Sequence, residues 1–142
     1  MFVKDILREK GHQVFTIDCN VTLLDVVDEL VDRGCGALVV TSGDGKLAGI
    51  VTERDILRAC AAVHQPLAST ALSQAMQADV VTAKLTDKVS DLMQVMTNRR
   101  IRHLPVLEDN DLVGIVSIGD VVKAHEAELQ TEKQMLMEYI QS

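Results

Sequence analysis

The sequence predicts a mixed α/β fold of the α+β kind, made of two repeats related by a pseudo-twofold axis and packed through their sheets. Each repeat is expected to have the order β-α-β-β-α. Three observations predict it: the chain repeats itself at about half its length, each copy alternates β-branched runs with amphipathic helical patterns, and a copy of about 60 residues buries too little apolar surface to be stable alone.

The repeat is clearest in one motif. Residues 49–55 recur as residues 114–120, and the glycine, the hydroxyl residue and the aspartate are each displaced by 65 positions. Upstream, residues 14–16 align with 80–82 at a displacement of 66. The change of one residue falls in the turn at 42–45, because a hairpin loop is where a length difference is tolerated.

The elements of the first repeat follow from periodicity. Residues 14–16 form the first strand, and residues 23–31 carry apolar side chains at helical spacing until Gly34 ends the pattern. Two β-branched runs, 37–41 and 47–51, flank the turn dipeptide Asp44–Gly45 and predict a hairpin. A second helix covers residues 56–62, with Thr52 or Asp55 as its N-terminal cap.

The second repeat shows the same order. Its strands are expected at 80–82, 103–107 and 112–116, and its helices at 89–98 and from Asp120 onward. Short lead-in helices at 3–10 and 71–76 correspond to each other. The predicted organisation is repeat 1 at residues 1–62, a linker at 63–75, repeat 2 at 76–125 and a C-terminal helical extension at 126–142, amphipathic and suited to dimerisation or to a frayed end.

Composition excludes several classes of function. The net charge of −7 and the aromatic content of 2% disfavour nucleic-acid binding, which needs basic residues for phosphates and rings for bases. Three cysteines without a CxxC spacing predict neither a disulfide framework nor a metal site. The chain lacks an apolar signal core and a run long enough to span a membrane, so we expect a cytoplasmic protein with no membrane partner.

The two motifs have a chemistry of their own. An aspartate at the start of a helix can accept two hydrogen bonds from a cis-diol, and free backbone N–H groups beside it suit phosphate oxygens. Gly49 and Gly114 would let another group approach the strand closely. The alternative is that the hydroxyl residues are only helix caps and the aspartates only acids of the first helical turn.

These residues resemble the CBS-repeat family, named after cystathionine beta-synthase, and in particular small proteins made of one tandem pair. The resemblance covers residues 3–125, with the motif Gly-hydrophobic-x-Thr/Ser-x-x-Asp present in both halves. It implies that the hydroxyl and the aspartate hold the ribose and phosphates of an adenosine ligand between the halves, which nominates Thr52, Asp55, Ser117 and Asp120. It also implies that strand backbone receives the adenine, at positions Thr16, Gly36, Ala37, Thr82, His103 and Pro105.

Basic residues add to the candidate site. Arg100, Arg102 and His103 stand where the resemblance implies contact with the ligand's phosphates, with Arg99 beside them and Arg54 inside the first motif. The alternative is a solvated basic helix end. The first repeat carries residues 34–37, Gly-Cys-Gly-Ala, at the corresponding places, so its site is expected to prefer a less charged group or the adenosine end of a longer ligand.

The resemblance therefore implies a regulatory module, not an enzyme, that senses AMP, ADP or ATP, with NAD(H) as a further candidate. Ligand would change the conformation or the geometry of a homodimer, and an unidentified protein partner would read that change. The alternative is a constitutive dimerisation or scaffold module with vestigial ligand sites. No metal-ligand, nucleophile-elbow, kinase or Walker motif is present in the sequence.

Overall fold

The computed structural model describes residues 1–141 and contains two three-stranded sheets, with strand orders β1-β2-β3 and β4-β5-β6. The chain divides into two compact units. The β1–β3 unit comprises residues 13–81 and 109–112, and the β4–β6 unit comprises residues 1–12, 82–108 and 113 onward. The α+β class and the order β-α-β-β-α of each repeat are confirmed.

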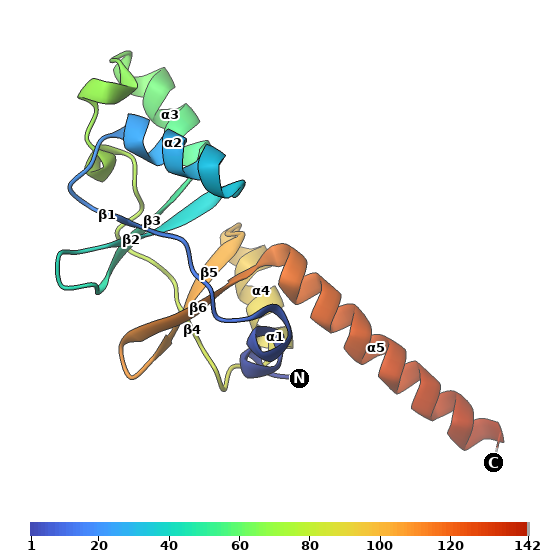
Figure 1. The fold of residues 1–142 in the computed structure, drawn as a ribbon. Helices are drawn as coiled ribbons and strands as arrows, with labels where there is room; N and C mark the ends of the chain where they lie inside the picture. Colours follow the sequence, from blue (N-terminus) through green and yellow to red (C-terminus); the bar gives the residue numbers. More distant parts are fainter. Residues whose placement is uncertain (142) are drawn as a thin grey trace. The chain divides into compact units, whose positions relative to one another are not determined.

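The β1–β3 unit is a small sheet with two helices on it (Figure 1). β1 (Thr16–Asp18) pairs in parallel with β2 (Ala37–Thr41), and β2 pairs in antiparallel with β3 (Leu47–Thr52). Helices α2 (Leu23–Arg33) and α3 (Glu53–Val63) follow β1 and β3. Their apolar faces pack on the sheet because buried side chains recur at helical spacing, Val26 and Leu30 in α2 and Ile56 and Ala59 in α3.

The β4–β6 unit repeats this arrangement with a longer final helix. β4 (Ala83–Lys84) pairs in parallel with β5 (His103–Glu108), which is followed by β6 (Asp111–Ser117). Helix α4 (Val89–Arg99) precedes β5, and α5 (Ile118–Gln141) follows β6. The predicted elements at 89–98, 103–107 and 112–116 are therefore found within one or two residues.

Three short predictions were wrong. The first strand of the first repeat lies at 16–18 and not at 14–16, because the residues that pair with Val39, Val40 and Thr41 of β2 are Thr16, Ile17 and Asp18. The first strand of the second repeat lies at 83–84 and not at 80–82, because the residues that pair with Val106 and Leu107 of β5 are Ala83 and Lys84. The expected helix at 71–76 is instead a 3₁₀ turn, η2 (Leu72–Gln74), preceded by η1 (Leu67–Ser69). Only three residues form this turn, and Leu72, which is fully buried, anchors it.

Each unit takes its lead-in segment from elsewhere in the chain. Helix α1 (Val3–Lys10) belongs to the β4–β6 unit, where Val3 N donates to Asp87 O at 2.9 Å and Val89 N donates to Met1 O at 3.1 Å. Residues 67–77 belong to the β1–β3 unit, where Leu23 N donates to Thr70 O at 2.9 Å. The segment before β1 thus completes the unit of β4–β6, and the segment before β4 completes the unit of β1–β3.

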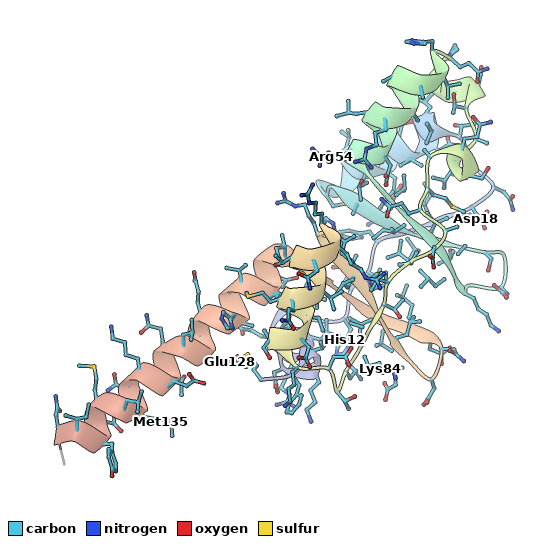
Figure 2. All side chains as sticks on the ribbon, turned by 180° about the vertical axis from the view of Figure 1, so that it is seen from behind. His12, Asp18, Arg54, Lys84, Glu128 and Met135 are labelled. Carbon is cyan, nitrogen blue, oxygen red and sulfur yellow. The ribbon has the colours of Figure 1, made fainter. Side chains whose placement is uncertain are left out.

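The last part of α5 is exposed along its whole length. Figure 2 shows Met135 on this part of the helix, and its exposed fraction is 64%. Other large apolar side chains of the segment are also exposed, namely Leu129, Leu136, Tyr139 and Ile140. The predicted helical extension is observed to residue 141, and Ser142 lies outside the described residues.

Within residues 1–141, no helix combines the length and the apolar composition needed to cross a membrane.

Candidate functional site

The two motifs occupy the same place in their units, where a strand ends and a helix begins. Thr52 is the last residue of β3, and α3 starts at Glu53. Ser117 is the last residue of β6, and α5 starts at Ile118. The hydroxyl residue therefore stands at the N-terminal cap of the helix, and the aspartate lies three residues later in its first turn.

Asp55 is saturated with hydrogen bonds from its own motif and from one other side chain. Its Oδ2 accepts from Thr52 N at 2.9 Å and from Thr52 Oγ1 at 3.0 Å. Its Oδ1 accepts from Gln77 Nε2 at 3.0 Å. Asp55 is only 5% exposed, so its carboxylate needs hydrogen-bond partners within the protein. The donors named here, from Thr52 and Gln77, are all neutral.

Asp120 is held differently. Its Oδ2 accepts from Ser117 N at 2.9 Å and from Lys10 Nζ at 2.7 Å, so this carboxylate is part of an ion pair. Burial raises the pKa of Asp120, but the hydrogen bond from Lys10, together with that from Ser117 and the charge of Lys10, outweighs burial and leaves the pKa below its ordinary value. Lys10 Nζ also donates to Ile115 O at 2.9 Å, which fixes the ammonium over the end of β6.

A third helix start gives a structural comparison. Thr22 and Asp25 at the beginning of α2 make the same reciprocal contacts, with Thr22 N donating to Asp25 Oδ2 at 3.0 Å and Asp25 N donating to Thr22 Oγ1 at 3.4 Å. Capping geometry alone therefore does not distinguish the motif from an ordinary capping box. The contacts that set the motif aspartates apart are those of Gln77 and Lys10.

The two motif glycines accommodate the protein's own lead-in segments. A Cβ on Gly49 would lie 2.7 Å from Gln77 O, and a Cβ on Gly114 would lie 2.7 Å from Leu7 Cδ1. The close approach inferred from the sequence is real, but in both units the group that approaches belongs to the chain itself.

The arginines that precede β5 lie at the exposed surface. Arg99, Arg100 and Arg102 are all exposed, as is Arg54 at the start of α3 (Figure 2). Arg100 caps α4 with a left-handed backbone, φ 55° and ψ 41°, and Gly34 caps α2 in the same way with φ 63° and ψ 38°. An arginine therefore stands where the other unit has a glycine, a conformation that costs a non-glycine residue about 1 kcal/mol.

The backbone positions nominated for adenine are spread along the strands. Gly36 O accepts from Glu53 N at 3.0 Å, and Arg102 O accepts from Ile118 N at 2.8 Å, so these two carbonyl groups already have partners. The other nominated positions are exposed Thr16 in β1, buried Ala37 in β2, exposed Thr82 before β4, half-buried His103 and buried Pro105 in β5.

The nominated residues separate by unit. The β1–β3 unit holds Thr16, Gly36, Ala37, Thr52, Arg54 and Asp55, and the β4–β6 unit holds Thr82, Arg100, Arg102, His103, Pro105, Ser117 and Asp120. Each unit thus presents one motif aspartate, but only the β4–β6 unit adds the group of arginines next to β5.

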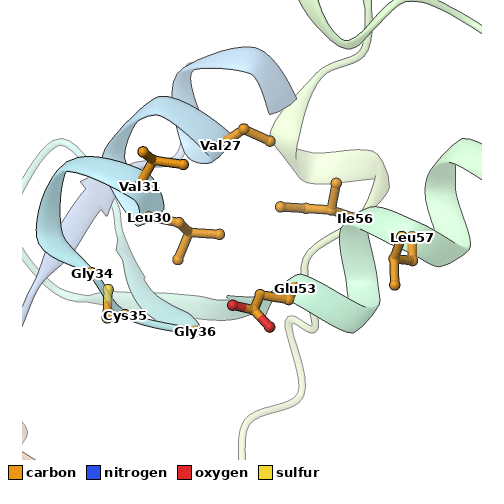
Figure 3. A pocket seen from close by; sticks show the side chains of 9 residues that line it. All are labelled: Val27, Leu30, Val31, Gly34, Cys35, Gly36, Glu53, Ile56 and Leu57. Carbon is orange, nitrogen blue, oxygen red and sulfur yellow. The ribbon is translucent and has the colours of Figure 1, made fainter.

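Each unit also has a cavity beside its motif helix. In the β4–β6 unit a cavity of about 350 Å³ lies between α1 and α5 and is lined by Lys10 and Asp120 among others. In the β1–β3 unit a cavity of about 540 Å³ lies between α2 and α3, and Figure 3 shows Glu53 at its edge beside Gly36. Its remaining lining is mainly apolar: Val27, Leu30, Val31, Gly34, Cys35, Ile56 and Leu57.

Sequence reasoning missed Lys10 and Gln77. Both lie at the end of a lead-in segment and outside the repeated motif, so their contacts with Asp120 and Asp55 depend on the tertiary fold. Over the described part of the chain, residues 1–141, no group of three or more His, Cys, Asp or Glu side chains could hold a metal ion.

Comparisons with known proteins identify the repeats. The CBS domain model matches residues 3–62 and 72–127. The mitochondrial CBS domain-containing protein CBSX3 of Arabidopsis thaliana is 37% identical over 147 aligned positions, which cover 98% of this chain and 71% of that protein.

Solved structures show the same fold. The CBS-domain containing protein ATU1752 from Agrobacterium tumefaciens is 42% identical, with a TM-score of 0.84 over 88% of this chain and 99% of that one. The CBS domain pair of protein MJ0100, solved with 5′-methylthioadenosine and S-adenosyl-L-methionine, is 26% identical, with a TM-score of 0.78 over 90% of this chain and 98% of that one.

Proposed function

Because the chain belongs to the CBS domain family, we propose that it is a ligand-binding regulatory module whose ligand is an adenine nucleotide. AMP is the first candidate, followed by ADP and ATP, and NAD(H) is a further one. In this proposal the module senses its ligand and does not convert it. Ligand binding changes the conformation of the module or the geometry of its homodimer, and an unidentified protein partner responds to that change.

The observation that carries this proposal is the surrounding of Asp120. A carboxylate able to bind a ribose cis-diol, an ammonium 2.7 Å from it and the exposed arginines that precede β5 belong to one unit. A nucleoside phosphate combines a diol with an anionic group and so matches these three kinds of partner. The structure of the MJ0100 pair with adenosine-containing ligands supports the same class of ligand.

Regulation would work through differential binding. A ligand that replaces Lys10 or Gln77 at a motif aspartate changes the contacts of the lead-in segment that carries each of these residues. The ligand thereby favours one arrangement of that segment over another. The shift in their equilibrium cannot exceed the ratio of the ligand's affinities for the two arrangements.

A scaffold function is the second candidate, and one observation favours it. Thr22 and Asp25 form the same capping box as Thr52 and Asp55. The motif residues could therefore be retained for helix capping alone, in a module that only dimerises.

Calorimetry separates the two functions. Protein stripped of carried-over nucleotide is titrated with AMP, ATP and NADH, and so are the Asp55→Ala and Asp120→Ala variants. Saturable binding of an adenine ligand that either substitution weakens supports the sensor. A folded dimer that binds none of the three ligands contradicts the sensor and leaves the scaffold.

A further inference from the structure

The two motif aspartates differ in the charge of the side chain that holds them. Asp55 accepts from the neutral amide of Gln77 at 3.0 Å, whereas Asp120 accepts from the ammonium of Lys10 at 2.7 Å. Both partner residues come from lead-in segments. The two partners thus differ in charge, and they bind different oxygens, Oδ1 of Asp55 and Oδ2 of Asp120.

The two units also differ at two equivalent positions, where the β1–β3 unit has glycine and the β4–β6 unit has arginine. Gly34 and Arg100 are equivalent, because each caps the preceding helix with a left-handed backbone. Gly36 and Arg102 are equivalent, because the carbonyl of each accepts from the first residue of the motif helix, Glu53 or Ile118.

The charged side chains beside the two motifs also differ. In the β1–β3 unit the carboxylate of Glu53 lies about 3.5 Å from where a Cβ of Gly36 would be. In the β4–β6 unit Lys10 forms an ion pair with Asp120, exposed Arg100 and Arg102 stand at the positions equivalent to Gly34 and Gly36, and Glu9 lines the same cavity as Asp120.

We propose that Lys10 and Gln77 set the ligand preference of the two motifs, so that the Asp120 site takes a phosphorylated adenosine ligand and the Asp55 site an unphosphorylated one. This inference rests on the proposed function. Both residues act as specificity-determining residues through the aspartate that they contact.

The mechanism is an exchange of partners on the carboxylate. A ribose hydroxyl that takes over Asp120 displaces the Lys10 ammonium, and that ammonium then needs a new anionic partner. A phosphate on the same ligand supplies one, and adenosine does not. At Asp55 a hydroxyl displaces only the neutral amide of Gln77, so no charge is left unpaired and no ammonium is released to pair with a phosphate.

The test is calorimetric titration with AMP and with adenosine. Two variants exchange the partners: Lys10→Gln gives Asp120 a neutral partner, and Gln77→Lys gives Asp55 a cationic one. Lys84→Gln is the control, since Lys84 is an exposed lysine of the same unit as Lys10 (Figure 2). Asp120→Asn serves as the background in which the Asp55 site is measured alone.

Lys10→Gln is expected to weaken AMP binding about tenfold, as is typical of a lost charge-assisted hydrogen bond, and to change adenosine binding by less than about threefold. In the Asp120→Asn background, Gln77→Lys is expected to strengthen AMP binding about fivefold or more. Lys10→Arg keeps the charge and should keep the preference for AMP. Lys84→Gln should behave as the unaltered protein.

Equal weakening of AMP and adenosine by Lys10→Gln would overturn the inference, because Lys10 would then only support the local fold. A Gln77→Lys variant with no gain for AMP would also overturn it. If neither ligand binds the unaltered protein, the proposed function itself fails, which is a distinguishable result.

Discussion

Arg100 is a residue held in a conformation that suits glycine better. Its φ of 55° matches the 63° of Gly34 at the equivalent helix end. A side chain in this left-handed region is strained, and such strain persists at positions where the side chain itself is needed. His64 caps α3 with the same φ of 55°, so the left-handed backbone alone does not identify a site, and the proposed contact of Arg100 with an anionic ligand is tested by substitution.

We predict that Arg100→Gly stabilises the fold and weakens nucleotide binding. Relief of the left-handed conformation should raise the free energy of unfolding by about 0.5–1 kcal/mol. The reciprocal change, Gly34→Arg, should lower it by about 1–2 kcal/mol. Urea denaturation measures both values, and a loss of stability in Arg100→Gly would show that the arginine side chain has a structural role.

The ion pair of Asp120 predicts a specific pH dependence. Because its pKa is lowered in the folded protein, the folded state binds fewer protons than the unfolded state near the ordinary carboxyl pKa of about 3.9. The stabilisation is therefore fully present above that pH and is lost as the pH falls through the lowered folded pKa.

Denaturation midpoints of the unaltered protein and of Asp120→Asn, measured from pH 7 down to pH 3, test this. The stability advantage of the unaltered protein should be constant above about pH 5 and should shrink below pH 4. In a Lys10→Met background the advantage should be smaller and should be lost at higher pH. An advantage that grows on acidification would contradict the assignment of the ion pair.

At the scale of elements, the lead-in segments explain both motif glycines. A Cβ on Gly49 would lie 2.7 Å from Gln77 O, which is main chain and is fixed by hydrogen bonds with Ile50 in both directions, at 3.0 and 2.9 Å. A Cβ on Gly114 would meet only the side chain of Leu7. Gly49 and Gly114 thus occupy the same place in the motif, but an added Cβ would meet fixed main chain at Gly49 and a movable side chain at Gly114.

We predict that Gly49→Ala and Gly114→Ala each destabilise the protein by about 1–3 kcal/mol. Combining Gly114→Ala with Leu7→Val should recover part of the loss, because the smaller side chain makes room for the new methyl group. No side-chain truncation at Gln77 should rescue Gly49→Ala, since the obstacle is a carbonyl oxygen. Thermal unfolding of the single and double variants measures the recovery.

Periodicity predicted the long elements because helices such as α2 and α4 repeat their apolar side chains over several turns. It misplaced β1 and β4 and predicted a helix where η2 lies, since two or three residues are too few to show a period. These short elements are fixed by pairing with β2 and β5 and by the burial of Leu72. The partners Lys10 and Gln77 had no sequence signal, because they reach Asp120 and Asp55 from sequence separations of 110 and 22 residues.

At the scale of the whole molecule, the units do not follow the repeats as the sequence divides them. Leu7 and Leu72 are both fully buried. Leu7 comes from the predicted repeat 1 but belongs to the β4–β6 unit, and Leu72 comes from the predicted linker but belongs to the β1–β3 unit. Leu7 lies next to β1 along the chain but packs with Gly114 of β6, while Leu72 lies in the core with Leu23.

We predict that Leu7→Ala and Leu72→Ala loosen different sheets. Each should cost about 2–5 kcal/mol, as buried leucines do. Hydrogen exchange followed by mass spectrometry should show faster exchange in β5 and β6 for Leu7→Ala, and in β2 and β3 for Leu72→Ala. Faster exchange of β2 and β3 in Leu7→Ala, with β5 and β6 unchanged, would contradict the assignment of α1 to the β4–β6 unit.

The exchanged lead-in segments also set an order of events during synthesis on the ribosome. The β1–β3 unit finds nearly all of its strands and helices once residue 81 has emerged. Helix α1 precedes the β1–β3 unit in the chain, yet the strand on which Leu7 packs is made more than a hundred residues after Leu7. At about 5–20 residues per second, its apolar face waits on the order of ten seconds for its partner. During that interval the nascent chain exposes Val3, Ile6 and Leu7, so α1 is buried only after the β1–β3 unit, which follows it in the chain, has its strands and helices.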